Sequence, residues 1–378
     1  GARSLPGVVD ILLGSDQDRD GIGPIVPRVD RPGPHARAML LPDVRPLATD
    51  RLQYVGHPIA AIVAEPAEVA DAAAEMITVD CDEGDPVVDP IAALAPGAPR
   101  VWPELPDNHC FRVEKGDGQA VRLALDAADH VTRARLRISR VAAVALEPRA
   151  ALASHDAVMG YRLDIGTQTP HRVATDLSKV FGIDPCEIQV VSKDTGGSFG
   201  MKNSGYPEYA IALWAARRTG RKINWVSDRL ESFLSDAHAR DQWVDAAIAI
   251  DDAGLILGLD VHITAGLGAC MGPATTHPSV ANLAGLAGVY RTPAIHVVVD
   301  GVFTNCQQVA PYRGAGRPEA TYIIERMIDI AAAEAGFDRV ELRRMIPTEA
   351  MPYETSLGWV YDCGAFETVM DRALEVAD

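Results

Sequence analysis

The sequence predicts a protein of the mixed α+β class with two domains, a small one followed by a larger one. Three observations carry this prediction. Short apolar runs of strand length alternate with longer stretches that have helical periodicity. A proline-rich segment, residues 84–118, separates two parts of the chain that differ in texture. The length of 378 residues allows two or three domains at roughly 150 residues each, and a composition of 48% hydrophobic and 23% charged residues excludes a disordered chain.

In the first part, residues 52–64 end in an apolar run that is typical of a buried strand. Pro66 then begins an Ala- and Glu-rich helical stretch that extends to about Met76, and residues 77–81 return to a strand pattern. These elements predict a compact strand–helix–strand unit. The six prolines of residues 84–118 each remove a backbone donor and restrict φ, so this segment is the predicted linker.

Strands and helices alternate after about residue 130. The predicted strands are residues 131–139, 149–154, 188–192, 246–250, 255–263 and 295–303. The predicted helices are residues 170–181, 207–218, 318–336 and 365–376. Proline stands in the first turn of the first three helices and glycine closes each of them, as these two residues favour those ends. Asp-Asp-Ala-Gly at residues 251–254 predicts a hairpin turn between two of the strands.

Charge and cysteine usage exclude several classes of protein. With 35 basic and 52 acidic residues the formal net charge is −17, which predicts no nucleic-acid partner. The six cysteines form no C-x-x-C pair, so neither a zinc ribbon nor an iron–sulfur cluster has the ligand spacing it needs. The chain shows no charged-then-apolar leader and no run of 18 apolar residues, and we expect a cytoplasmic protein without a membrane span. Because it begins Gly-Ala-Arg without Met, we expect a fragment or a processed product.

A glycine-rich loop, Gly-Gly-Ser-Phe-Gly at residues 196–200, follows one predicted strand. It matches G-x-S-x-G, the pattern that makes Ser198 the nucleophile of a serine hydrolase, but the next helix begins only at Pro207, too late for that turn. Its three glycines also allow successive N–H groups to point into one anion-binding concavity, bracketed by Asp194 and Lys202. From the residues alone, a hydrolase, an anion site and a structural turn all stay open.

A second loop, residues 311–319, has the sequence Pro-Tyr-Arg-Gly-Ala-Gly-Arg-Pro-Glu. Its glycines surround Arg313 and Arg317, and it opens onto a long helix whose N-terminus favours anions. The third glycine of a dinucleotide fingerprint is missing, which disfavours a Rossmann domain. Arg317 has a simpler interpretation as part of a helix cap near Glu319, so Arg313 is the candidate for ligand binding.

The two loops and five further segments together resemble one family. The two loops lie within residues 194–202 and 310–320. The further segments are residues 54–65, 87–90, 146–149, 166–172 and 225–229. In this order they resemble the amino-terminal half of the molybdenum-binding large subunit in the xanthine dehydrogenase/aldehyde oxidase family of molybdenum hydroxylases. The resemblance implies a small α/β hammerhead domain over residues 1–110, with its front strand or strands missing. It further implies the first part of a mixed α/β molybdopterin-binding domain over residues 119–378.

The resemblance also implies a cofactor and partner chains. The cofactor is molybdopterin, or its cytosine dinucleotide form, whose dithiolene holds molybdenum without a metal ligand from the protein. The implied reaction hydroxylates a carbon centre of an aldehyde or an N-heterocycle with water as the oxygen source, and passes electrons to 2Fe–2S clusters and FAD. The implied partners are a 2Fe–2S subunit, an FAD subunit and the second half of the molybdenum subunit. That second half carries the family's catalytic Glu, so we expect this chain to be inactive alone.

The family's site residues transfer to the two loops. The implied cofactor-binding residues are Gly197, Ser198, Phe199, Gly200 and Arg313. The implied substrate pocket consists of Phe199, Asn203, Tyr312 and Gly314. Arg313 is the one candidate catalytic residue that the resemblance implies in this chain.

Four departures from the family pattern bear on function. Residues 140–145 lack the Gln that contacts an oxo ligand in the family, and Ser198 replaces the third glycine of the usual G-G-G-F-G. Asn203 stands where purine-oxidising members have a Glu, which argues against xanthine. Gly314 stands where carbon monoxide dehydrogenases have a copper-binding Cys, which argues against that activity. The missing Gln leaves a non-catalytic homologue as an alternative, besides a serine hydrolase built on Ser198.

Overall fold

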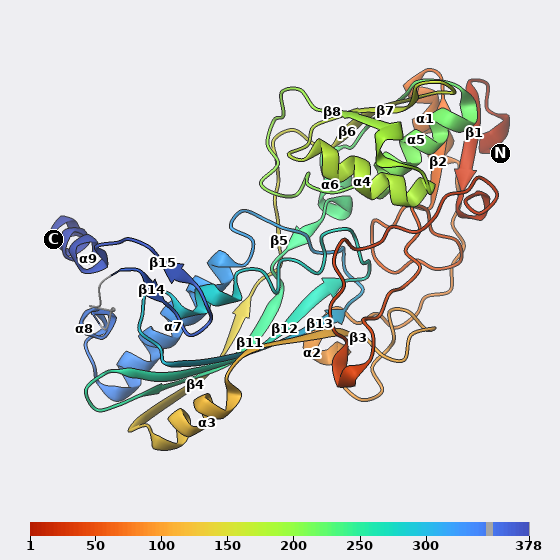
Figure 1. Cartoon of the computed structure of the whole chain (residues 1–378). Coiled ribbons are helices and arrows are strands. Elements are labelled where there is room, and N and C mark those ends of the chain that lie inside the picture. The colour runs from red at the N-terminus through yellow and green to blue at the C-terminus, as the bar shows by residue number, and fades with distance from the viewer. Residues whose placement is uncertain (345–350, 378) are drawn as a thin grey trace.

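Two β-sheets divide the protein into two lobes (Figure 1). The computed structural model describes residues 1–344 and 351–377. One lobe holds a five-stranded sheet and the other a four-stranded sheet, and each sheet has a hydrophobic core of its own. After residue 108 the chain builds the five-stranded lobe, crosses to the four-stranded lobe and then returns to the first. The mixed α/β fold class predicted from the sequence is confirmed.

In the five-stranded lobe the strand order is β3-β13-β12-β11-β4. The pair β12 and β13 is parallel, and the other neighbouring pairs of this sheet are antiparallel. The strands are β3 (His109–Gly116), β13 (Ala294–Phe303), β12 (Ile256–Gly268), β11 (Gln242–Ile250) and β4 (His130–Ile138). Helix α7 (Arg317–Ala335) and the short helix η5 (Leu283–Ala287) pack on one face of the sheet. Helix α3 (Gly118–Ala127) packs on the other face.

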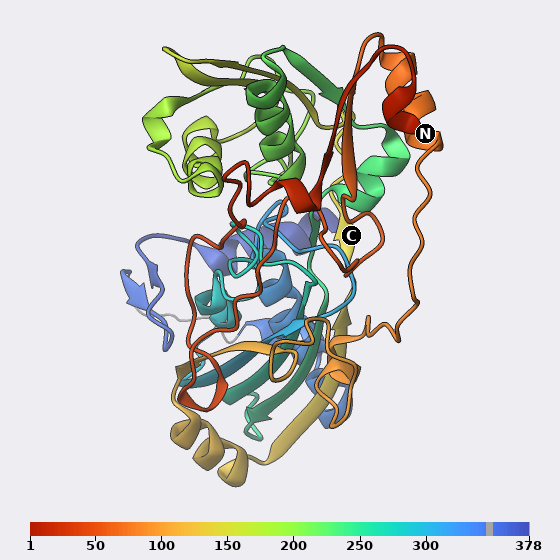
Figure 2. The same ribbon diagram turned by 90° about the vertical axis from the view of Figure 1, so that its right-hand side faces the viewer.

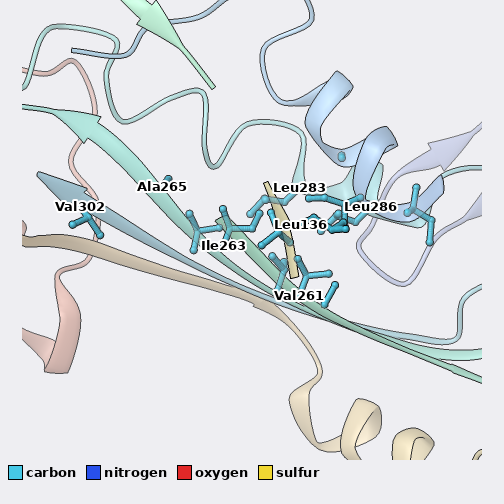
Figure 3. Close-up of a cluster of buried hydrophobic side chains, with 14 of the residues drawn as sticks. Leu136, Val261, Ile263, Ala265, Leu283, Leu286 and Val302 are labelled. Atoms are coloured by element: carbon cyan, nitrogen blue, oxygen red, sulfur yellow. The ribbon is translucent and has the colours of Figure 1, made fainter. Parts of the chain in front are cut away.

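The core of this lobe follows from the two-residue period of its strands. Val261 and Ile263 on β12 point to the same face, where they meet Leu286 of η5 (Figure 3). Gly258 points to the opposite face, where a Cβ would lie only 2.9 Å from Ala124 of α3. The absence of a side chain at this position therefore lets α3 approach the sheet closely.

In the four-stranded lobe the strand order is β8-β7-β6-β9. The strands are β8 (Ile188–Val191), β7 (Gly160–Ile165), β6 (Ala150–Asp156) and β9 (Ile223–Val226). Helices α4 (Pro170–Phe181) and α5 (Pro207–Thr219) cover one face of the sheet. Ala151 and Ala153 of β6 are buried on that face, whereas Leu152 between them is exposed. This lobe therefore has one covered face and one open face.

The first hundred residues extend over both lobes. The elements here are β1 (Val8–Leu13), its antiparallel partner β2 (Ala60–Ala64) and α1 (Ala67–Glu75). Leu12 and Val63 of this strand pair join the core of the four-stranded lobe. Extended chain then leads to the five-stranded lobe (Figure 2), where the N–H of Val87 donates to Oδ1 of Asn305 at 2.9 Å.

Further elements complete the described ranges. The remaining helices are η1 (Ala2–Ser4), η2 (Gly14–Asp16), η3 (Pro34–Ala36), α2 (Pro90–Ala93), η4 (Pro185–Glu187), α6 (Arg229–Ser235), α8 (Arg339–Arg343) and α9 (Phe366–Ala377). The remaining strands are β5 (Val141–Ala142), β10 (His238–Ala239), β14 (Tyr353–Glu354) and β15 (Val360–Tyr361). In the part of the chain that the structure describes, no helix combines the length and the apolarity needed to cross a membrane.

The elements predicted after residue 130 are confirmed, including the hairpin of β11 and β12, which turns at Gly254 with a φ of 87°. Two predictions in the first part are wrong. Residues 77–81 form no strand, because Val79 is exposed and no strand of the described ranges pairs with them. The predicted linker extends too far, because its last residues form β3, whose Phe111 is buried and which pairs with β13.

A fully buried arginine holds the four-stranded lobe together. The guanidinium of Arg149 donates to Glu208 on α5 at 2.7 and 2.9 Å and to Asp236 at 2.6 Å. It lies over the ring of Tyr206, 3.8 Å from the ring centre. The two carboxylates neutralise a charge whose burial would otherwise be strongly unfavourable. Because Arg149 directly precedes β6, this cluster joins β6, α5 and the end of α6.

Replacing Arg149 with leucine leaves Glu208 and Asp236 without their buried partner. We expect Arg149→Leu to lower the free energy of unfolding by about 3–5 kcal/mol, the typical cost of breaking one side of a buried ion pair. Urea denaturation measures the loss. Arg135→Leu is the matched control, since Arg135 pairs with Asp245 on the surface and little change is expected there. Equal losses in the two variants would contradict the role of Arg149.

On the face of the five-stranded sheet where α3 packs, His296 of β13 lies between two carboxylates. Its Nδ1 is 2.8 Å from Oδ1 of Asp260 on β12, and its Nε2 is 2.9 Å from Oε1 of Glu114 on β3. Burial lowers the pKa of His296, but the hydrogen bonds to the two carboxylates outweigh burial and raise this pKa above its usual value of 6.5. Protonated His296 therefore stabilises the pairing of these three strands.

The stability of the chain is expected to depend on pH through His296. A group whose pKa is higher in the folded state stabilises fully below its unfolded pKa, and this contribution is lost as the pH rises through the folded pKa. We expect His296→Gln to lower the free energy of unfolding more at about pH 5.5 than at about pH 9. Urea denaturation of the variant and the wild type at both pH values measures this, and a loss independent of pH would contradict it.

Candidate functional site

The glycine-rich loop, residues 196–200, lies between β8 and α5 and has an unusual backbone. Gly197, Phe199 and Gly200 have φ angles of 104°, 53° and 100°, in the left-handed region, whereas Ser198 does not. Such alternation turns successive N–H groups toward one side and forms a concavity that binds anions. Within the described ranges, the N–H groups of Gly197, Ser198 and Phe199 donate to no other group. The predicted anion site therefore has the backbone it requires.

Phe199 combines backbone strain with exposure. A non-glycine residue with a φ of 53° is uncommon, and such strain is concentrated at binding sites. Its side chain is 41% exposed. A Cβ on Gly197 would lie 3.5 Å from the Phe199 ring and 3.3 Å from Cβ of Ala145. Glycine at this position therefore keeps the concavity beside the ring open.

An ion pair between a buried lysine and a partly exposed glutamate closes the base of the loop. Lys202 is 1% exposed, and its Nζ donates to Oε2 of Glu147 at 2.7 Å. The same oxygen accepts the N–H of Gly196 at 2.8 Å. Burial raises the pKa of Glu147, but the hydrogen bonds from Lys202 and Gly196 outweigh burial and lower this pKa. Glu147 therefore stays ionised and fastens the loop. Asp194, which brackets the loop in the sequence together with Lys202, is exposed.

Ser198 points into the loop and not toward a catalytic base. The side chain is buried; its Oγ donates to Oε1 of Gln168 at 2.5 Å and accepts the N–H of Lys202 at 3.1 Å. The same Oε1 of Gln168 accepts the N–H of Gly200 at 2.8 Å. A serine nucleophile needs a base within hydrogen-bond reach, and no histidine of the described ranges bonds to Ser198. The serine hydrolase interpretation is therefore wrong.

The second loop packs directly on the glycine-rich loop. The N–H of Arg313 donates to the carbonyl of Phe199 at 2.8 Å. A Cβ on Gly200 would lie 2.4 Å from the carbonyl oxygen of Pro311, so the two backbones can approach this closely because Gly200 has no side chain. Two segments that are distant in sequence therefore form one continuous surface.

Three predicted residues of the second loop take part in this surface in different ways. Arg313 is exposed, and its guanidinium makes no hydrogen bond within the part of the chain that the structure describes. Tyr312 is partly buried, with its ring centre 5.0 Å from the guanidinium carbon of Arg240. Gly314 has a φ of 93°, and a Cβ there would lie 2.5 Å from Cδ of Pro318. Arg313 therefore offers a free cation, and Gly314 is a position that excludes a side chain.

Asn203 is bonded to a different segment. Its Oδ1 accepts the hydroxyl of Thr169 at 2.6 Å, next to the start of α4. Its carbonyl accepts a hydrogen bond from Arg28 at 2.8 Å, and Arg28 also pairs with Asp176 of α4. The amide oxygen of Asn203 thus already accepts a hydrogen bond. The guanidinium of Arg313 in the second loop, by contrast, makes none within the described ranges.

The N-terminus of α7 is capped by its own glutamate. Oε2 of the buried Glu319 accepts the N–H of Gly316 at 3.0 Å, and its Oε1 accepts a hydrogen bond from Arg240 at 2.7 Å. A carboxylate of the chain itself therefore already occupies the helix end that is predicted to favour an anionic ligand. Arg317, the first residue of the helix, donates to the carbonyl of Gly314 at 3.4 Å, in agreement with its interpretation as part of the cap.

Three residues that organise the site were not predicted, namely Gln168, Glu147 and Arg240. Gln168 lies two residues before Pro170 and Glu147 lies directly before Pro148, and a polar residue close to a conformationally restricted proline could have drawn attention. Arg240 had no such signal, because its role depends on a left-handed φ of 69° that the local sequence does not predict.

Two family models match most of the chain. A model of the molybdopterin cofactor-binding domain matches residues 101–346, which is more than half of the chain. A model of the a/b hammerhead domain of aldehyde oxidase and xanthine dehydrogenase matches residues 1–85. The chain therefore belongs to the molybdopterin-binding family of the aldehyde oxidase and xanthine dehydrogenase type. The predicted family and the predicted order of a hammerhead domain before a molybdopterin-binding domain are confirmed.

Individual relatives agree with this family. The chain is 33% identical over 352 residues to the carbon monoxide dehydrogenase large chain of Hydrogenophaga pseudoflava, a match that covers 88% of this chain and 44% of the relative. It is 32% identical over 381 residues to the nicotine 6-hydroxylase large subunit of Paenarthrobacter nicotinovorans, covering 100% and 46%. The solved CO dehydrogenase from Oligotropha carboxidovorans matches with a TM-score of 0.90 and 30% identity, covering 100% and 48%. The chain spans about half the length of these relatives.

The close approach of the two loops predicts a large effect of a methyl group at Gly200. We expect Gly200→Ala to lower the free energy of unfolding by roughly 2–4 kcal/mol, because the new Cβ adds an overlap with Pro311 to the cost of a left-handed φ. Gly220→Ala is the matched control, since Gly220 has a φ of 65° and open space around it. We expect a loss of about 1 kcal/mol there. Equal losses in urea denaturation would contradict the close packing of the loops.

Proposed function

We propose that this chain is the amino-terminal half of the molybdenum-binding subunit of a molybdenum hydroxylase. In this proposal the enzyme hydroxylates a carbon centre of an aldehyde or an N-heterocycle, with water as the source of oxygen. The observation that carries the proposal is the joint surface of the two loops, with an exposed aromatic ring and, within the described ranges, three unpaired N–H groups and a free guanidinium. The match to the molybdopterin cofactor-binding domain supports it.

The groups on this surface fit a pterin that carries a phosphate. A pterin has ring-nitrogen and carbonyl acceptors, and a phosphate is an anion that N–H groups and a guanidinium bind well. We assign the N–H groups of Gly197, Ser198 and Phe199 and the side chain of Arg313 to this role, with Gly200 bringing the loops together. The described ranges contain no group of three His, Cys, Asp or Glu side chains placed to hold a metal ion. When bound, molybdopterin or its cytosine dinucleotide form supplies two-electron redox chemistry through its own molybdenum.

The chain's own residues orient ligands and neutralise charge. A guanidinium carries a permanent positive charge, so we assign Arg313 the stabilisation of negative charge on an oxygen and not the transfer of a proton. Phe199 and Tyr312 offer aromatic surface to the substrate, and we place Asn203 and Gly314 in the same pocket. Gly314 has no side chain that could hold a second metal, which favours carbon hydroxylation over oxidation of carbon monoxide.

We further propose that the chain works in a cytoplasmic multi-subunit complex. The proposed partners are the second half of the molybdenum subunit, a 2Fe–2S subunit and an FAD subunit, with a small-molecule substrate and no nucleic acid. The names of the relatives, a large chain and a large subunit, support partner chains. The six cysteines are free and lack cluster spacing, which supports electron transfer to clusters on other chains. The family matches to residues 1–85 and 101–346 support two domains in this order, for which we propose the bounds 1–110 and 119–378.

The native complex provides the test. We expect molybdenum and pterin in amounts equal to this chain, and oxidation of aldehydes or N-heterocycles. We expect Arg313→Ala to lower kcat/KM by roughly 10²- to 10³-fold, the usual cost of removing one group that stabilises developing negative charge. Arg162→Ala, at an exposed arginine on β7, is the matched control and should leave turnover unchanged.

Two outcomes would overturn the proposal. Absence of molybdenum and pterin from the native complex would remove the assigned cofactor. Stoichiometric molybdenum without oxidation of any aldehyde or N-heterocycle would favour a non-catalytic homologue.

A further inference from the structure

We propose that Arg240 is a positioning residue that holds residues 312–316 of the second loop in the conformation that receives the cofactor. Arg240 lies between β10 and β11, outside both loops. The inference deepens the proposed function and rests on it where cofactor retention is concerned. The contacts that carry it are all within this chain.

The guanidinium of Arg240 bridges the second loop and the helix that follows it. Its Nη1 donates to Oε1 of Glu319 on α7 at 2.7 Å, and its Nη2 donates to the carbonyl of Arg313 at 3.2 Å. Its carbon lies 5.0 Å from the ring centre of Tyr312, within the range of a cation–π interaction. Glu319 in turn accepts the N–H of Gly316. One planar group therefore connects, directly or through Glu319, the start, the middle and the end of the loop.

The backbone under Arg240 is itself firmly held. Arg240 and Asp241 have φ angles of 69° and 67°, a left-handed conformation that side-chain-bearing residues rarely adopt in succession. The buried carboxylate of Asp241 accepts hydrogen bonds from Arg137 at 2.9 Å and from Arg140 at 2.7 Å. The carbonyl of Asp241 accepts the N–H of Gly266 at 2.8 Å. These bonds stabilise a strained turn, and strain that is stabilised in this way is characteristic of functional positions.

The shape of the guanidinium matters here as well as its charge. Arg240 and Glu319 are both largely buried and neutralise each other, which leaves Arg313 as a free cation in the loop. Lysine would keep the charge of Arg240, but its ammonium is compact. It could not lie flat on Tyr312 while also reaching Glu319 and the carbonyl of Arg313. The Arg240→Lys variant therefore keeps the positive charge but loses the contacts that position the loop.

Arg240→Lys in the native complex tests the inference. We expect amide hydrogen exchange of residues 312–316 to become about tenfold faster and the pterin and molybdenum content to fall, while exchange in the hairpin turn at residues 251–254 stays unchanged. Per molybdenum atom, we expect kcat to fall about tenfold with little change in KM, because the same loop presents Arg313. Glu319→Gln keeps an acceptor for the N–H of Gly316 but loses the charge, and we expect smaller changes in the same direction.

Arg135→Lys is the matched control, because Arg135 makes a two-pronged pair with Asp245 on the exposed side of β4. Equal changes in Arg135→Lys and Arg240→Lys, or unchanged exchange in Arg240→Lys, would overturn the inference. So would faster exchange with undiminished cofactor content. If Arg240→Lys fails to fold, as circular dichroism would reveal, Glu319→Gln decides by the same criteria. A wild-type complex without molybdopterin would overturn the proposed function, whereas the exchange rates would still decide whether Arg240 holds the loop.

Discussion

The burial of one charged side chain, Arg149, sets the position of each part of the site. Three chain segments leave its ion cluster, and each of them reaches a loop. Arg149 lies two residues after Glu147, and Glu147 holds the base of the glycine-rich loop. Glu208 lies in the first turn of α5, the helix that follows this loop, and Asp236 precedes the turn that carries Arg240. Because a buried charge is tolerated only when its partners are in place, the packing of the four-stranded lobe and the geometry of the site are coupled.

The glycine-rich loop directs its polar side chain inward and its backbone outward. Ser198 bonds to Gln168, and Lys202 at the base of the loop pairs with Glu147, whereas three consecutive N–H groups of the loop stay unpaired within the described ranges. Such a division suits a protein whose cofactor performs the chemistry, because the protein then supplies position and electrostatics. It also explains why the G-x-S-x-G pattern is misleading here. Ser198 has the sequence context of a nucleophile and the contacts of a structural residue.

Prediction from the sequence succeeded where a segment carries its own pattern. The hairpin of β11 and β12 was predicted because its strands have apolar patterns and its turn has Asp and Gly. Prediction failed where a distant partner decides: residues 77–81 have the pattern of a strand but no neighbour to pair with, and β3 lies among prolines but pairs with β13. In the site, Gly197, Gly200 and Arg313 could be identified from motifs. Arg240 could not, because its contacts join segments that are far apart in the chain.

Periodicity, turn residues and motif spacing are local properties, so the sequence alone was sufficient for most elements, the family and the two loops. Only the folded chain decided how those loops are used. It leaves the N–H groups of residues 197–199 without a partner among the described residues, places Glu319 at the start of α7 where a ligand was expected, and sets Arg240 against Tyr312. The physical reason is that the free energy of a polar group depends on its burial and on its partner. Both are set by the packing of distant segments.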